Sequence, residues 1–325
     1  MEFVPPAMGD PRRVAIVLPP HGGVGTGNLR TAERWLALLN GLGVPARLAE
    51  GEELASGDTL VALNAVKSHR IITDFRRRFP HGKLVLAVTG TDLNRRDSRE
   101  WQESVAAADA LVVLQEKALQ ALTPAEQEKA HLILQSVACR ADFAPRTRDG
   151  FFQVAVVGHL RAEKDPLLAA RAVRRLPDCS RVRLLQAGAI LEEKYRAAVA
   201  REEKENPRYQ WLGELAHGEA LELIARSELM VLTSTSEGGP GVIGEAVTLD
   251  TPVLSSAIDG VVGLLGEDFP GYFAPGDAGA LAGLLSRVEK EQVFYQELQA
   301  AGRARRALFA PERERAAWAR LLAQL

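Results

Sequence analysis

From Arg13 onward, short apolar runs alternate with longer stretches in which apolar residues recur at helical spacing. This alternation is typical of parallel strands joined by crossover helices, because a parallel pair of strands needs a long connection. The apolar runs are nearly continuous rather than interrupted at every second residue, which indicates strands that helices cover on both faces. The sequence therefore predicts the α/β class.

The apolar runs fall into two sets. The first comprises residues 14–20, 58–64, 83–90, 110–115 and 131–136, and the second comprises residues 152–158, 181–188, 209–213, 228–234 and 252–258. A polar, Pro-containing stretch without periodicity, residues 140–150, separates them. Single cores stop growing at about 250–300 residues, so a chain of 325 residues favours two domains. We predict two Rossmann-like, doubly wound domains facing across a cleft, residues 1–147 and 148–308, and a C-terminal helix, residues 309–325, that packs back on the first.

Composition excludes several classes of protein. The 40 Lys and Arg residues balance 42 Asp and Glu residues, which argues against a basic nucleic-acid binder. No apolar run approaches the roughly 20 residues of a membrane span, and residues 1–12 lack the features of a signal peptide, so we expect a cytoplasmic protein. Cys139 and Cys179 lie far apart without metal-ligand spacing, which favours two reduced thiols, although a reactive role for Cys139 stays open.

A glycine-rich stretch, His21 to Asn28, follows the first expected strand and opens the first expected helix. Glycines let a backbone approach a ligand closely, and a helix N-terminus favours negative charge. The spacing does not fit the dinucleotide pattern G-x-G-x-x-G, but Glu50 keeps that alternative open as a ribose acceptor. A plain flexible loop is an equal alternative.

A second glycine-rich turn, Ser236 to Ala246, follows a strand of the second set and carries Glu237 and Glu245. Backbone N–H groups at such a turn can bind a phosphate, and carboxylates can accept hydrogen bonds from sugar hydroxyls. The spacing allows both glutamates to reach one elongated ligand. The alternative is a capped helix with one surface glutamate.

Two cations, Arg161 and Lys164, follow the first strand of the second set. The carboxyl end of a parallel strand is where open α/β sheets bind ligands, and this pair of side chains suits a diphosphate. Together with Glu237 and Glu245 in the same half, they predict a site for a nucleoside diphosphate. His159 is a further candidate beside them, with a packed histidine as the alternative.

These motifs, R-x-x-K after the first strand of the second domain and then E-x7-E, resemble those of family-4-like glycosyltransferases of the GT-B architecture. The resemblance implies that Arg161 and Lys164 hold the donor diphosphate, Glu245 the ribose hydroxyls and Glu237 the donor sugar. It also implies that Trp211 to Leu215 lines the base. The remaining donor-binding residues expected are Leu212, Gly238, Gly239, Pro240, Gly241 and Val242.

A closer resemblance is to the selenosugar synthases of the selenoneine pathway. The matching stretches are residues 27–35, 67–69, 89–93, 112–119, 156–166, 206–215 and 263–273, of which the last is the most specific. It implies transfer from UDP-N-acetylglucosamine or UDP-glucose to selenophosphate, giving a 1-selenosugar without metal or cofactor. It also implies functional links to an enzyme that supplies selenophosphate and one that forms selenoneine. The family has His, Asn and Asn where this chain has Asn64, Gly241 and Val262, differences that can alter substrate choice.

The acceptor is expected at strand ends of the first domain. The candidate residues are Gly23, Gly25, Gly27, Asn28, Lys67, Thr89 and Thr91. His69 is a candidate catalytic base toward a hydroxyl acceptor, or else a residue that starts a helix. Asp92 and Asp97 lack the D-x-D spacing of a metal site.

Two other functions stay open. A glycosyltransferase with a hydroxyl acceptor, such as a lipid, a polysaccharide or a small molecule, is the first, and a basic, aromatic helix at Lys67 to Phe79 hints at a membrane acceptor. A non-catalytic nucleotide-sugar-binding protein is the second, since a fold does not fix a function.

Overall fold

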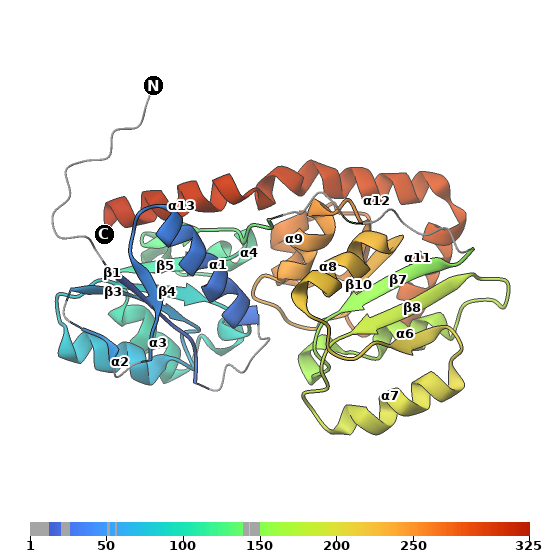
Figure 1. The fold of residues 1–325 in the computed structure, drawn as a ribbon, viewed down its shortest axis with the longest axis horizontal. Coiled ribbons are helices and arrows are strands. Elements are labelled where there is room, and N and C mark those ends of the chain that lie inside the picture. The colour runs from blue at the N-terminus through green and yellow to red at the C-terminus, as the bar shows by residue number, and fades with distance from the viewer. Residues whose placement is uncertain (1–12, 21–26, 51–52, 56, 139–142, 144–149) are drawn as a thin grey trace. The chain divides into compact units, whose positions relative to one another are not determined.

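The computed structural model describes residues 13–20, 27–50, 53–55, 57–138, 143 and 150–325, and it divides the chain into two compact units (Figure 1). Unit 1 contains residues Met1–Leu134 and Glu312–Leu325, and unit 2 contains Gln135–Pro311. The first break between the units falls before residues 147 and 148, where the boundary is expected and which lie outside the described residues.

Unit 1 is built on a six-stranded, wholly parallel sheet in the order β2-β1-β3-β4-β5-β6. In that order the strands are β2 (Ala46–Leu48), β1 (Arg13–Val17), β3 (Asp58–Leu63), β4 (Leu84–Val88), β5 (Ala110–Val113) and β6 (Ala130–Leu132). The helices are α1 (Gly27–Gly41), α2 (His69–Arg78), α3 (Arg99–Ala107), α4 (Glu116–Gln120), α5 (Pro124–Gln127) and α13 (Pro311–Gln324), with a 3-10 turn η2 (Asp92–Arg95).

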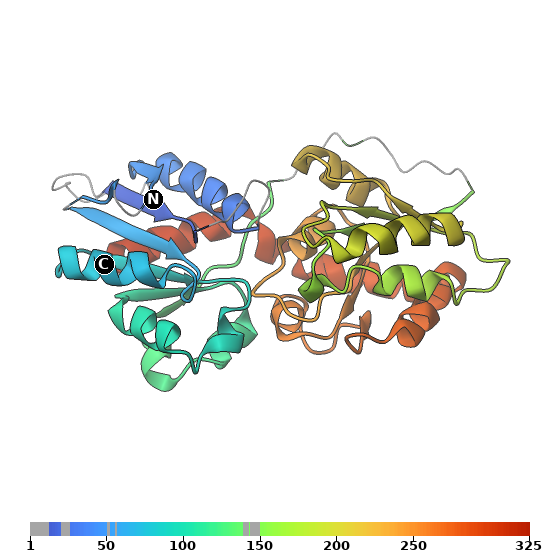
Figure 2. The same cartoon turned by 90° about the horizontal axis from the view of Figure 1, so that it is seen from below.

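Successive residues of the central strands pack into two different clusters. Leu60 and Ala62 of β3 face the cluster that contains Ile72 of α2, whereas Val61 and Leu63 face the cluster that contains Trp35 of α1. Helices α1 and α13 cover one face of the sheet, and α2 and α3 cover the other (Figures 1 and 2). Burial on both faces explains the continuous apolar runs and confirms the predicted α/β class.

The C-terminal helix α13 is part of the core of unit 1. Its Trp318 packs edge-on against Trp35 of α1 with 4.8 Å between ring centroids. Its Glu314 is buried, accepts a hydrogen bond of 2.7 Å from the Trp35 indole and pairs with Arg34 at 3.0 Å. A buried carboxylate with both partners in place fixes this helix on α1.

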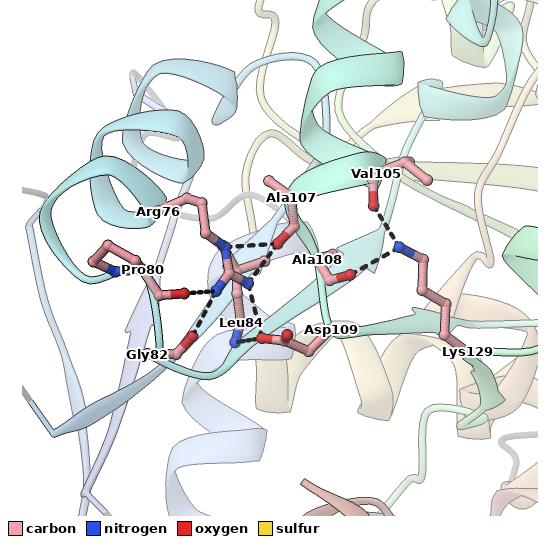
Figure 3. Close-up of polar contacts among 9 residues, drawn as sticks. All are labelled: Arg76, Pro80, Gly82, Leu84, Val105, Ala107, Ala108, Asp109 and Lys129. Atoms are coloured by element: carbon pink, nitrogen blue, oxygen red, sulfur yellow. Dashed lines mark hydrogen bonds and ion pairs between the residues drawn. The ribbon is translucent and has the colours of Figure 1, made fainter.

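Arg76 of α2 and Lys129 bond to other groups of the protein itself (Figure 3). Arg76 donates to the carbonyls of Ala107 at 2.6 Å and Gly82 at 2.9 Å, and it pairs with Asp109. Lys129 donates to two further carbonyls at the end of α3, and its burial lowers its pKa. These cations satisfy the last carbonyls of α3 and favourably oppose its dipole.

The aromatic side chains of α2 and of Phe79, the residue after it, pack against the core of unit 1. Phe75 is buried, Phe79 packs against the same core cluster, and Arg78 donates to the carbonyl of Leu54 at 2.8 Å. Packing and capping contacts therefore account for Phe75, Phe79, Arg76 and Arg78, whereas Arg70 and Arg77 stay largely exposed.

Unit 2 has a second six-stranded parallel sheet, in the order β12-β11-β10-β7-β8-β9. In that order the strands are β12 (Tyr272–Phe273), β11 (Val253–Ser256), β10 (Leu229–Leu232), β7 (Phe152–Val157), β8 (Val182–Ala187) and β9 (Tyr209–Trp211). The helices are α6 (Leu168–Val173), α7 (Lys194–Glu205), α8 (His217–Arg226), α9 (Gly241–Thr248), α10 (Asp259–Leu265), α11 (Ala278–Lys290) and α12 (Gln292–Arg305), with 3-10 turns η3 (Ala162–Lys164) and η4 (Arg306–Phe309).

Candidate functional site

The strand order of unit 2 brings together two loops that carry charged side chains. Strands β7 and β10 are neighbours, although β8 and β9 separate them in the chain. The loop after β7 carries the R-x-x-K motif, and the loop after β10 carries Glu237. A small crevice, open to solvent, lies between these strand ends. Its lining is Val156, Val157, Gly158, Lys164, Pro166, Gln186, Val231, Leu232, Thr233 and Ser234.

Lys164 and Glu237, 73 residues apart, form an ion pair beside this pocket. The same oxygen of Glu237 accepts a hydrogen bond of 2.7 Å from the hydroxyl of Ser234. The side chains of Lys164 and Glu237 are 19% and 10% exposed, so the pair is screened from water yet within reach of the pocket. An ammonium and a carboxylate held together here can exchange partners when an anionic, hydroxyl-bearing ligand arrives.

The backbone on both sides of the ion pair is fixed. Thr235 donates its N–H to the carbonyl of Glu163 at 2.8 Å, and the hydroxyl of Thr233 donates to the carbonyl of Lys164 at 2.8 Å. Gly260 of α10 approaches so closely that a Cβ there would lie 2.2 Å from the carbonyl oxygen of Glu237. A glycine at this position therefore lets α10 support the loop that carries Glu237.

Arg161, at the start of η3, makes a weaker ion pair than Lys164 does. In the described part of the chain its Nε has no hydrogen-bond partner, and its carboxylate neighbour Glu163 lies 3.9 Å away. The side chain is 42% exposed. A partly exposed guanidinium suits an anion, because its donors form a planar fork.

The glycine-rich turn leads into α9, whose N-cap is Pro240. The first N–H groups of a helix have no partners within it, so Gly241 and Val242 bring donors and a positive dipole end to this turn. Gln135 donates to the carbonyl of Gly239 at 3.0 Å. A Cβ at Gly241 would meet nothing closer than 4.0 Å, so the departure from the family's Asn reflects no lack of space.

Glu245 lies in α9, and its Oε1 is 2.9 Å from Nε2 of His217, the first residue of α8. Sequence reasoning did not identify His217, because nothing in its local sequence marks it and its neighbour comes from a different helix. The predicted glutamates Glu237 and Glu245 both lie in this region, each with a different partner.

The remaining donor candidates lie at the ends of β7, β8 and β9. Nδ1 of His159 accepts a hydrogen bond of 3.1 Å from the N–H of Ala189, which assigns the ring proton to Nε2. Leu212 packs against a small cluster that includes Ala187, and the indole of Trp211 donates to the carbonyl of Gly188 at 2.9 Å.

In unit 1, both ring nitrogens of His69 have partners on α3. Nδ1 lies 3.2 Å from the hydroxyl of Ser104, and Nε2 lies 3.2 Å from a carboxylate oxygen of Glu103. His69 is also the first residue of α2. This arrangement favours its alternative interpretation as a residue that starts and anchors a helix.

The other acceptor candidates are spread along the carboxyl edge of the first sheet. Lys67 is exposed, and Thr89 is 2% exposed with a hydroxyl that has no partner in the described residues. Thr91 is half-buried, and Gly27 and Asn28 begin α1. Gly23 and Gly25 lie outside the described residues, as does Cys139.

Asp92, considered in the sequence only as a possible metal ligand, has a clear structural position. Its buried carboxylate accepts hydrogen bonds from the N–H groups of Ala65 at 2.9 Å and Thr89 at 3.0 Å, which joins the ends of β3 and β4. Burial raises the pKa of Asp92 to about 6, although these hydrogen bonds oppose the shift. Asn64, at a left-handed φ of 71°, completes the junction with a 3.2 Å bond to the Thr89 carbonyl.

Two kinds of feature are absent from the described residues. No three His, Cys, Asp or Glu side chains there are grouped as metal ligands. Among the described helices, none has the length and apolar character needed to cross a membrane.

The sequence of this chain matches a known protein family. The profile of the family described as "Glycosyl transferases group 1" matches residues 140–305. A putative teichuronic acid biosynthesis glycosyltransferase, TuaC of Bacillus subtilis (strain 168), is 34% identical over 86 residues, which cover 26% of this chain and 22% of that protein. The chain thus matches less than a quarter of the length of this relative.

Two solved structures resemble nearly the whole chain. The crystal structure of Anabaena Alr3699/HepE in complex with UDP and glucose has a TM-score of 0.73 at 17% identity, covering 96% of this chain and 100% of that one. Sucrose-phosphate synthase (tll1590) from Thermosynechococcus elongatus has a TM-score of 0.76 at 16% identity, covering 96% and 98%. At such identities the likeness concerns the fold, and it confirms the predicted GT-B fold.

Proposed function

The chain belongs to the family of group 1 glycosyl transferases, and from this we propose that unit 2 binds a UDP-sugar through the loops after β7 and β10. The observation that carries the proposal is the ion pair of Lys164 and Glu237 beside the pocket at these strand ends. Adjacent opposite charges at this edge of a parallel sheet suit a ligand with both phosphate and hydroxyl groups.

In this proposal Arg161 and Lys164 bind the diphosphate. Glycosyl transfer breaks the bond between the anomeric carbon and the diphosphate, so negative charge grows on the departing UDP. Cations and helix N–H groups already in position stabilise that charge, and single groups of this kind contribute about 3–4 kcal/mol. The N–H groups at the start of α9 would add to the same effect. When Lys164 turns to the diphosphate, Glu237 becomes available for hydroxyls of the sugar.

The resemblance to family-4-like glycosyltransferases supports the remaining assignments. Glu245 would accept hydrogen bonds from the ribose hydroxyls, and the segment around Leu212 would line the base. Gly238 and Gly239 would supply backbone contacts. His159 would contribute its Nε2–H, the proton position that its bond to Ala189 favours.

For the acceptor we propose selenophosphate, on the basis of the resemblance to selenosugar synthases. Selenium attacks the anomeric carbon, a carbon–selenium bond forms, and UDP leaves; water must then cleave the selenium–phosphorus bond to give the 1-selenosugar. Selenium is already a strong nucleophile, so this acceptor needs no general base, which is compatible with the engaged ring nitrogens of His69. The residues that we propose to bind the selenophosphate anion are Lys67, Thr89 and Thr91.

The experiment is an anaerobic incubation of the purified protein with UDP-N-acetylglucosamine or UDP-glucose, with and without fresh selenophosphate. We expect UDP and a selenium-containing sugar, detected by mass spectrometry, only when both substrates are present. Release of UDP without selenium incorporation would instead indicate a hydroxyl acceptor. Retention of the donor without any turnover would indicate a nucleotide-sugar-binding protein.

A further inference from the structure

Glu245, the proposed ribose ligand, is already hydrogen-bonded across to a neighbouring helix. Its Oε1 lies 2.9 Å from Nε2 of His217, and the two side chains are 18% and 46% exposed. Among the described residues, His217 is the side chain that this carboxylate contacts. The second oxygen of the carboxylate has no partner there and is left for a ligand.

The start of α8 does not account for this bond. The N–H of Ala216, the N-cap residue, is satisfied by the carboxylate of Glu219 at 2.8 Å, which is the usual arrangement at a helix N-terminus. The imidazole of His217 therefore adds nothing to the cap and reaches instead to α9. Its exposure also excludes a major contribution to core packing.

We propose that His217 is a positioning residue of the donor site, which holds one oxygen of Glu245 so that the other faces the ribose hydroxyls. A glutamate side chain has three rotatable bonds, and fixing it before the ligand arrives reduces the entropy lost on binding. Because Nε2 must donate to the carboxylate, a neutral imidazole with its proton on Nε2 or a protonated one can perform this task. The inference rests on the proposed binding of ribose by Glu245.

The test compares two nucleotides rather than activities, so it needs no acceptor. Titration calorimetry measures the dissociation constants of UDP and of 2′,3′-dideoxyuridine diphosphate, which lacks both ribose hydroxyls. For His217→Ala we expect UDP to bind about fivefold more weakly, the effect of losing one modest interaction, while the dideoxy nucleotide binds as it does to the wild type. A histidine that served only stability would weaken both nucleotides equally or neither.

Three further variants make the outcome decisive. His217→Gln, whose amide can donate to Glu245 from a similar distance, should restore the preference for UDP. His81→Ala, which removes an exposed histidine from unit 1, should leave both constants unchanged. Melting temperatures of all variants show that they are folded.

Glu245→Ala separates failure of this inference from failure of the proposed function. If Glu245→Ala weakens UDP and His217→Ala does not, the positioning assignment is overturned and the donor site stands. If Glu245→Ala itself leaves UDP binding unchanged, the donor site is wrong and the assignment of His217 is overturned with it.

Discussion

The two units share one architecture but use the carboxyl edges of their sheets differently. In unit 2, Lys164 and Glu237 form an ion pair at that edge, beside a pocket. Arg161 is close to Lys164 in the sequence, and its Nε has no hydrogen-bond partner in the described residues. In unit 1, the polar groups at the same edge, Asn64 and Asp92, bond to backbone groups. The same fold thus carries an ion pair of side chains at this edge in one unit and a hydrogen-bonded junction of strands in the other.

The largest effect is expected at the charged pair of unit 2. Lys164→Ala should lower the rate of sugar transfer about 100-fold or more, because a cation that neutralises the departing diphosphate is lost. Steady-state assay of UDP release measures this. Lys204→Ala, which removes an exposed lysine of α7, is the matched control. A Lys164→Ala enzyme with wild-type activity would place the chemistry outside this pocket.

In unit 1, the largest effect should be on stability rather than activity. Glu314→Ala removes the acceptor of the buried Trp35 indole N–H and the carboxylate that pairs with Arg34, at a cost of about 3 kcal/mol in the free energy of unfolding. Urea unfolding followed by tryptophan fluorescence reports mainly on unit 1, which holds Trp35, Trp101 and Trp318 of the chain's 4 tryptophans. Glu312→Ala, on the exposed side of the same helix, should change little. Equal effects of the two substitutions would disprove the anchoring of α13 by Glu314.

A smaller, pH-dependent effect is expected at Asp92. Its pKa is raised from the ordinary 3.8 to about 6, so between these values the folded protein binds more protons than the unfolded chain. Stability contributed by this group is therefore present at low pH and is lost as pH rises through 6. The unfolding free energy of the wild type relative to Asp92→Asn should fall by about 2 kcal/mol between pH 4 and pH 7. A pH-independent difference would show that the hydrogen bonds from Ala65 and Thr89 offset the burial, and a difference that rises with pH would show that they outweigh it.

The smallest effect is expected for Gly241→Asn, which introduces the residue that the resemblance to selenosugar synthases implies at this position. A side chain at this position has open space around it and an ordinary backbone conformation, so stability should change by no more than about 0.5 kcal/mol. Thermal melting measures the stability, and calorimetry with UDP shows whether the extra amide contributes to binding. A loss of several degrees in melting temperature would mean that the turn is more tightly packed than its contacts indicate.

The sequence predicted the fold well because burial on both faces produces strands that are continuous apolar runs. Strands β2 and β12 were missed, since strands of 3 and 2 residues leave no such pattern. For the candidate site, the sequence indicated individual residues but not their contacts. The pairing of Lys164 with Glu237 depends on β10 lying beside β7, an order that crossover connections set and local sequence does not show.

Two residues illustrate that limit in opposite directions. His69 looked like a candidate base because an isolated histidine after a strand gives no sign of its partners, which come from α3. His217 was not predicted as a site residue, because its partner Glu245 lies on another helix. Tertiary contacts decide whether a histidine serves chemistry or structure, and they become visible only in the folded chain.

The most direct test of the proposed donor site is a crystal structure of the protein with UDP. The account predicts the diphosphate within hydrogen-bonding distance of Arg161 and Lys164, the ribose hydroxyls on Glu245, and Lys164 released from Glu237. Binding of UDP at the carboxyl edge of the first sheet, with the Lys164–Glu237 pair intact, would contradict it.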